Sequence, residues 1–130
     1  MVSFKKGYAD DVGIDICLDQ EVIFRPFETK IIDIGPIETE PGISLMMCAR
    51  SSAAAKGIIV NQCPIDPNYK GHVHIIAHNC SNYVQIFKKG KAFAQLYAFR
   101  FETPLVDFTV KKPGTRTESS FGGTDNAGTD

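Results

Sequence analysis

The sequence predicts an all-β fold, because its apolar residues alternate in short segments, its turns are regularly spaced and it carries almost no helical pattern. Segments such as 13–18 and 43–48 alternate or run apolar only briefly before a turn residue interrupts them. Turn signals, among them Pro41-Gly42, recur about every ten residues, which is typical of a β-sandwich, a barrel or a jelly roll.

The individual elements follow from these interruptions. We expect strands over residues 13–18, 21–24, 30–34, 43–48, 57–60, 72–77, 83–87, 92–101 and 105–110. Gly35-Pro36 is expected to end the third strand. One short helix is predicted after Arg50, with Ser51 as its N-cap, three alanines, Lys56 in its last turn and Gly57 closing it.

Composition restricts the class of protein. The chain has 130 residues and a net charge of −1, so it suits one domain and lacks the basic surface that binds nucleic-acid polymers. No apolar run approaches the ~20 residues of a membrane helix, and the N-terminal segment has no secretory pattern. The four cysteines contain no CxxC pair, and we expect them to be buried free thiols in a reducing compartment.

The last twenty residues differ from the rest of the chain. Phe121 is the only large apolar side chain in residues 111–130. Such a segment buries too little surface to offset its ordering entropy, so we expect a flexible C-terminal arm.

Three groups of residues could carry chemistry. Arg50 followed by serine hydroxyls favours an anion site, although a plain capped turn remains the alternative. Asp66, placed after an apolar run, could act as a general base, but an aspartate before Pro-Asn is more often a turn cap. His72, His74 and His78 could ligate zinc, yet without a matching carboxylate or cysteine we favour the wet face of a strand.

Five short motifs, taken in order, resemble those of the trimeric dUTP pyrophosphatase (dUTPase) family and its sister dCTP deaminases. They cover nearly the whole chain: Gly13-Ile14-Asp15-Ile16, Arg50-Ser51-Ser52 through Gly57, Ile65-Asp66-Pro67-Asn68-Tyr69-Lys70-Gly71, Gly90 through Gln95-Leu96, and Arg116 through Thr124. The resemblance implies a distorted jelly-roll or β-clip barrel over residues 1–110, with an arm over 111–130 that closes on the active site.

The resemblance also implies an activity: hydrolysis of dUTP to dUMP and pyrophosphate, assisted by Mg²⁺, which limits uracil in DNA and supplies dUMP. It implies that Asp66 activates water, that Asp15 supports the metal through water, and that the sugar and base contact Tyr69, Asn61 and Phe121. The phosphate-binding residues would be Arg50, Ser51, Ser52, Gln95, Arg116 and Thr124. It further implies a homotrimer with shared sites in the cytoplasm, the host cytoplasm for a phage or viral protein.

The sequence departs from the family pattern at several positions. Lys91-Ala92 stands where the family usually has Asp-Arg, Ser119-Ser120 stands for Gly-Gly, and the segment before Asp66 is short. These departures leave the preference for uracil over cytosine open. A dCTP deaminase remains the first alternative, but residues 67–101 contain no Asp or Glu to shuttle protons. A non-catalytic nucleotide-binding regulator is the second, although Asp66 and Arg116 are both present.

Overall fold

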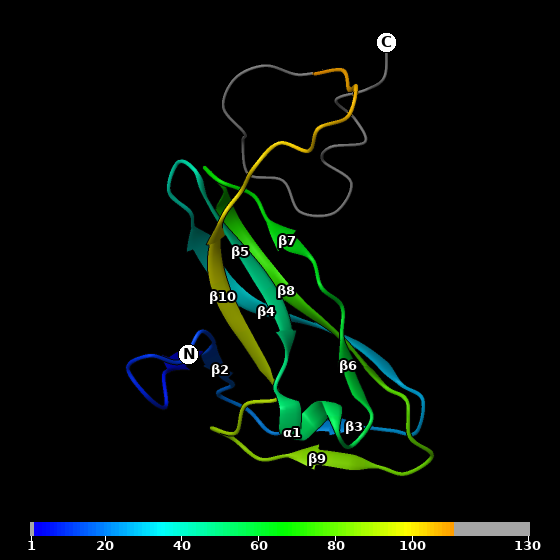
Figure 1. Ribbon diagram of the computed structural model, residues 1–130. Coiled ribbons are helices and arrows are strands. Elements are labelled where there is room, and N and C mark those ends of the chain that lie inside the picture. The colour runs from blue at the N-terminus through cyan, green and yellow to red at the C-terminus, as the bar shows by residue number, and fades with distance from the viewer. Residues whose placement is uncertain (1, 111–130) are drawn as a thin grey trace.

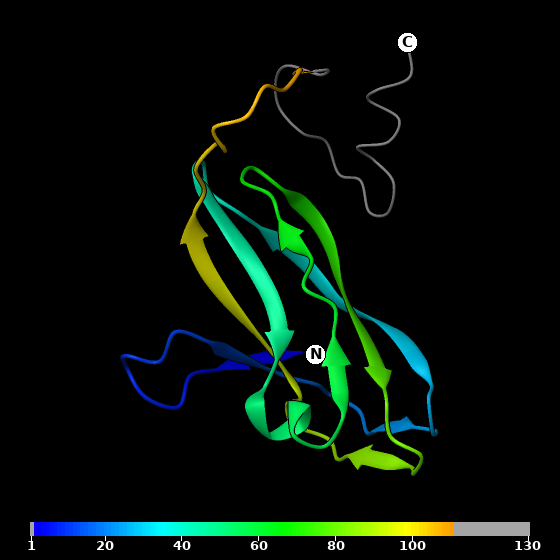
Figure 2. The same ribbon diagram turned by 45° about the vertical axis from the view of Figure 1, so that its right-hand side comes forward.

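A computed structural model describes residues 2–110 and confirms the all-β architecture (Figures 1 and 2). The strands are β1 (Ser3–Lys5), β2 (Ile14–Cys17), β3 (Val22–Phe24), β4 (Thr29–Glu38), β5 (Ile43–Ala49), β6 (Ile58–Val60), β7 (Pro64–Ile65), β8 (Lys70–Asn79), β9 (Gln85–Phe87) and β10 (Ala94–Arg100). Within the described range the one helix is α1 (Ser51–Ala54).

The strands form two facing sheets and a small ribbon. One sheet has the order β1-β2-β10-β5-β7, the other has the order β4-β8-β6, and every pair is antiparallel. The β3–β9 ribbon lies across one end of the molecule beside α1 (Figure 1). Each sheet turns one face toward the core, which explains the alternating pattern of the sequence.

The core forms where these inner faces meet. Along β8 the residues at odd positions from 71 to 79 are buried, whereas those between them are half-buried or exposed. Three rings, Phe24, Phe87 and Phe93, pack with centroids 5.0–6.1 Å apart next to the ribbon. Their contacts attach the ribbon to the sheets, because aromatic pairs add stability beyond the apolar area that they bury.

A buried polar network joins the end of β8 to the ribbon. Asn79 is 1% exposed, and its Nδ2 donates to the carbonyl oxygens of Arg25 and Tyr83 at 3.0 and 2.8 Å. Gln85 donates from Nε2 to Asn79 Oδ1 at 3.1 Å and to the carbonyl of Lys56 at 2.6 Å. The network therefore holds four separate segments together.

Several boundaries differ from the sequence prediction. Gly35-Pro36 does not end a strand, because β4 continues to Glu38 through an irregularity in its pairing with β8. Gly35 has φ +92°, which a glycine adopts without strain, and its N–H donates to Asp33 Oδ1 at 2.8 Å. The short strands β1 and β7 carried no clear signal and were not predicted.

The strand predicted over residues 105–110 is wrong. No strand forms in that stretch, and its large apolar side chains are exposed, with Leu105 at 103%. A β-strand needs a neighbour to satisfy its backbone groups, and the described part of the chain offers none here.

Two local predictions also need correction. Arg50, not Ser51, is the N-cap of α1, and no side chain caps the helix. All four cysteines are free, as expected, but only Cys17 is buried, whereas Cys63 and Cys80 are exposed. Among the described residues, no helix has the length and apolarity needed to span a membrane, and the cytoplasmic location stays a prediction.

Candidate active site

The first polar group of the site lies where β2, β10 and the end of β5 meet. Asp15 on β2 pairs with Gln95 on β10, and Arg50 follows β5 directly. Arg50 Nε lies 3.2 Å from Asp15 Oδ1, and Gln95 Nε2 donates to the carbonyl of Ala49 at 3.0 Å. Three strands far apart in sequence thus fix a cation, a carboxylate and an amide side by side.

Gly13 allows Gln95 to occupy this place. A Cβ on Gly13 would lie only 1.9 Å from Gln95 Oε1. Gln95 pairs with Asp15 on one side and with Cys48 of β5 on the other. Burial raises the pKa of the Cys48 thiol, although a hydrogen bond with Gln95 opposes the shift. A neutral thiol at this point adds no negative charge beside Arg50.

Ser51 and Ser52 complete this group. Both belong to the first turn of α1 and are exposed, directly after Arg50. The second guanidinium contact of Arg50 is made by Nη1, which donates to the carbonyl of Ala92 at 3.4 Å. We call Asp15, Arg50, Ser51, Ser52 and Gln95 the basic-end group.

The second polar group, Asp66 and Tyr69, lies at a tight turn after β7. Asp66 is half-buried at the end of β7, as the sequence predicted, and Asn68 adopts φ +58° in the turn. Thr39 Oγ1 donates to the carbonyl of Asp66 at 2.5 Å and accepts from the N–H of Tyr69 at 2.8 Å. Thr39 is a supporting residue that the sequence did not reveal, because it lies 27 residues before Asp66.

An open hollow adjoins this turn. Its volume is about 430 Å³, and its lining includes Asp66, Ser44, Phe99 and Phe101. The Asp66 turn therefore has open space beside it, in which a ligand group or a neighbouring chain could lie.

The two polar groups lie at opposite ends of β5. Ile65, next to Asp66, pairs with Leu45 near the start of β5, whereas Arg50 follows its end. At ~3.3 Å per strand residue, this places Asp66 and Arg50 roughly 15–20 Å apart. Figures 1 and 2 show the same arrangement, with β7 and α1 at opposite ends of the strand. Within residues 2–110, one chain alone does not bring the predicted site residues of the two groups together.

Asn61, the predicted base contact, follows β6 and is exposed. Its Oδ1 lies 3.0 Å from His78 Nε2, and Thr29 Oγ1 lies 2.7 Å from His78 Nδ1. The position of His78 next to Asn61 was not predicted.

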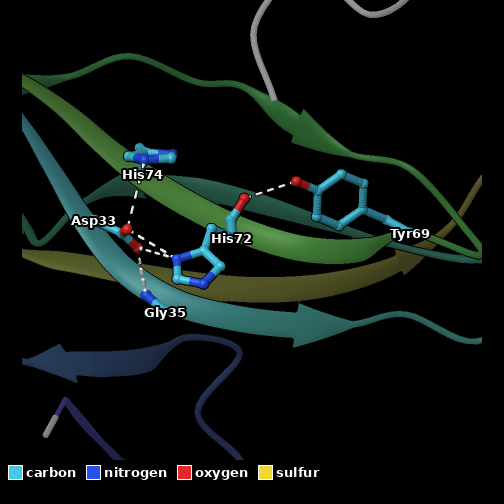
Figure 3. Close-up of polar contacts among 5 residues, drawn as sticks. All are labelled: Asp33, Gly35, Tyr69, His72 and His74. Carbon is cyan, nitrogen blue, oxygen red and sulfur yellow. Dashed lines mark hydrogen bonds and ion pairs between the residues drawn. The ribbon is translucent and has the colours of Figure 1, made fainter. Parts of the chain in front are cut away.

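The other two histidines point to a shared carboxylate (Figure 3). Asp33 Oδ2 lies 2.8 Å from His72 Nδ1 and 3.9 Å from His74 Nε2. The hydrogen bond from the Gly35 N–H, and then that from His72, hold the pKa of Asp33 below its ordinary value. Nearby, the hydroxyl of Tyr69 donates to the carbonyl of His72 at 2.6 Å. No three His, Cys, Asp or Glu side chains within residues 2–110 are arranged to hold a metal ion, so the zinc interpretation gains no support.

Comparison with known proteins decides the family. The dUTPase family model matches residues 1–125. The chain belongs to the dUTPase family. This match confirms the family and the enzyme class expected from the sequence.

Individual relatives agree with this assignment. Over 91% of this chain and 86% of its own length, the deoxyuridine 5'-triphosphate nucleotidohydrolase of Clostridium kluyveri is 32% identical. The Pol polyprotein of caprine arthritis encephalitis virus is 29% identical over 88% of this chain, which spans only 11% of that polyprotein. The dUTPase of Staphylococcus bacteriophage 80alpha (G164S mutant with dUpNHpp) shares the fold, with a TM-score of 0.69, 19% identity and coverage of 94% and 90% of the two chains.

Three predicted site residues of this dUTPase-family chain, Arg116, Phe121 and Thr124, lie outside the described residues, as does the whole arm. Mg²⁺ is compatible with the basic-end group. Asp15 is partly exposed and supplies one carboxylate, and Mg²⁺ usually keeps several waters and takes its other ligands from substrate phosphates.

Proposed function

We propose that this dUTPase-family chain hydrolyses dUTP to dUMP and pyrophosphate. The observation that carries the proposal is that Arg50 and Gln95 lie together, partly exposed, beside two exposed serine hydroxyls, while Asp15 holds the Arg50 guanidinium. The arginine and the hydroxyls come from one motif and the amide from another, and together they are the donors that a triphosphate requires, because its ~3–4 negative charges need cations and hydrogen-bond donors.

Arg50, Ser51, Ser52 and Gln95 bind the phosphates in this proposal. The Asp15 carboxylate and the Ala92 carbonyl hold the guanidinium of Arg50 in place before substrate arrives. Little side-chain ordering is then left for the binding step. Mg²⁺, when bound, would supply further charge neutralisation, and Asp15 would support it through water.

Asp66 acts on the attacking water. The carboxylate accepts a proton from the water as the water oxygen bonds to the α-phosphorus, and the bond from this phosphorus to the bridging oxygen breaks, releasing pyrophosphate. Tyr69 lies against the deoxyribose and leaves no room for a 2′-hydroxyl. The hydroxyl of Thr39 bonds to the backbone of both Asp66 and Tyr69. It thereby fixes the position of the general base, Asp66, relative to Tyr69, the residue that contacts the sugar.

A complete site requires more than one copy of the chain, because the two polar groups lie at opposite ends of β5. We propose a homotrimer in which the Asp66 turn of one copy faces the basic-end group of another. The arm, residues 111–130, closes the site with Arg116 and Thr124 on the γ-phosphate and Phe121 over the base.

The substitution Asp66→Asn tests the mechanism. We expect kcat for pyrophosphate release from dUTP to fall by about 10²–10⁴-fold, because the amide cannot accept the proton of the water. Binding of dUpNHpp, measured by calorimetry, should persist, since Asp66 is not a phosphate ligand. Turnover that survives this change would refute Asp66 as the base. Ammonia release from dCTP by the unmodified protein would instead favour a deaminase.

A further inference from the structure

The segment after β6 places Asn61 on the outer face of the β4-β8-β6 sheet. Ile58 and Val60 are buried, whereas Ile59 and Asn61 are exposed, so the alternation of β6 continues one residue beyond the strand. The N–H of Asn61 donates to the carbonyl of Ile76 at 2.9 Å, which fixes its backbone against β8. The backbone of Asn61 is therefore fixed, while its carboxamide group remains accessible to solvent.

His78 determines which way this carboxamide faces. The Asn61 atom 3.0 Å from His78 Nε2 is Oδ1, which carries no hydrogen, so Nε2 must donate. In the neutral ring Nδ1 is then an acceptor, and the Thr29 hydroxyl at 2.7 Å can donate to it. In this arrangement the Thr29 hydroxyl and His78 Nε2 each donate to an acceptor, and Asn61 presents its Oδ1 to His78.

In this orientation the Asn61 side chain can offer a ligand only its two Nδ2 hydrogen-bond donors. Its Oδ1 is engaged by His78, and within residues 2–110 its Nδ2 has no hydrogen-bond acceptor. Two N–H groups facing a ligand favour a carbonyl oxygen. They disfavour an amino group, because donors would then meet donors and remain unsatisfied.

We propose that His78 is a positioning residue for base selection: by holding Asn61 Oδ1, it turns the Asn61 amide hydrogens toward a pyrimidine with an oxygen at C4 and against one with an amino group. The proposal rests on the proposed function, specifically on Asn61 as a base contact. Uracil carries this oxygen and cytosine carries the amino group. Thymine carries the same oxygen as uracil. The Asn61 contact therefore distinguishes an oxygen from an amino group at C4, but it does not distinguish uracil from thymine.

The experiment measures binding of the non-hydrolysable imido triphosphates of deoxyuridine, deoxycytidine and thymidine to the full chain by calorimetry. In His78→Leu we expect the preference for the uracil over the cytosine analogue to fall about tenfold, the value of one hydrogen bond. The preference for the uracil over the thymine analogue should not change. A generally loosened site would alter both preferences together.

Three variants sharpen the test. His74→Leu removes an imidazole from the same strand and the same face, one that lies 3.9 Å from Asp33, so both preferences should stay as in the unmodified chain. His78→Gln keeps a donor for Asn61 Oδ1 and should retain most of the uracil preference. In an Asn61→Ala background, His78→Leu should cause no further loss, because the group that it orients is gone.

Equal losses in His78→Leu and His74→Leu, or additive losses in the Asn61→Ala background, would overturn the proposal. If His78→Leu does not fold, Thr29→Val applies the same test by removing the hydroxyl that fixes the imidazole. Since binding requires no turnover, a chain that binds the uracil analogue selectively but releases no pyrophosphate refutes the proposed hydrolysis alone. Unchanged preferences with normal turnover refute this inference alone.

Discussion

At the scale of single residues, Gly13 has a specific task beside Gln95. A Cβ there would overlap Gln95 Oε1, and the flexible end of the Gln95 side chain must then move away from the proposed phosphate position. For Gly13→Ala we expect KM for dUTP to rise about tenfold, the value of one lost hydrogen bond. The free energy of unfolding, measured in urea, should change by less than about 1 kcal/mol, because the residue that yields is a mobile side chain.

The matched control for Gly13→Ala is the same change in a Gln95→Ala background. There the new methyl group no longer meets the Gln95 side chain, so KM should equal that of Gln95→Ala alone. A further rise in KM would show that Gly13 acts on something other than Gln95.

Asp33 should make stability depend on pH. Its pKa lies below the ordinary 3.8 in the folded chain, first because of the Gly35 N–H and then because of His72. The folded state therefore binds the proton less readily than the unfolded state, so the stabilisation is complete above the unfolded-state pKa and is lost as pH falls through the folded-state pKa. Between about pH 5 and pH 3, urea midpoints should fall more steeply for the unmodified chain than for Asp33→Asn. Parallel slopes for the two proteins would contradict this assignment.

At the scale of elements, the buried network around Asn79 should carry much of the attachment of the β3–β9 ribbon. Asn79→Leu removes the partner of two part-buried carbonyl oxygens and of the buried Gln85 amide, and we expect a loss of about 2–4 kcal/mol in the free energy of unfolding. Asn82→Leu, three residues along the chain at an exposed position, should change stability by no more than about 0.5 kcal/mol. Equal effects of the two substitutions would mean that the network adds nothing beyond surface polarity.

The elements that the sequence predicted are those whose signal is local. The buried and exposed positions of β8 alternate in the sequence itself, and the alanines before Gly57 mark α1 within one or two turns. The continuation of β4 past Gly35 could not be predicted, because it depends on pairing with β8 and on a hydrogen bond that the Gly35 N–H donates to Asp33. Residues 105–110 have the apolar character of a strand, but strand formation also requires a partner, which local pattern does not reveal.

The candidate site, too, was only partly predictable from the sequence. Motifs identified Asp15, Arg50, Asp66 and Gln95 one by one, yet the sequence did not show that they form two groups at opposite ends of β5. Supporting contacts were also hidden, because Thr39 and His78 lie 27 and 17 residues from the residues that they hold. Such contacts are set by strand register, which emerges only when the sheets are paired.

At the scale of the whole molecule, shared sites predict complementation between two inactive variants. Arg50→Ala and Asp66→Asn should each lack activity. After joint unfolding and refolding as an equal mixture, about a quarter of the sites should combine an intact Asp66 from one copy with an intact Arg50 from another, by random assembly of symmetric oligomers. The measurement is pyrophosphate release by the mixture relative to the unmodified protein.

A matched mixture provides the control for complementation. Asp66→Asn combined with Tyr69→Ala places both defects in the same polar group, so no mixed site regains a complete Asp66 turn. That mixture should add nothing to the residual activity of its components. Restoration by both mixtures, or by neither, would be inconsistent with a site divided between copies.

The distance between the two ends of β5 has a consequence for how output scales with protein amount. If one strand length separates the water-activating turn from the phosphate-binding residues, an isolated copy does no chemistry, and activity arises only from collisions that produce assemblies. Nucleotide hydrolysis would then rise more steeply than linearly with the concentration of the chain while most copies are unassembled, and linearly once assembly is complete. A single structural spacing would thereby make the specific activity of this protein depend on its concentration.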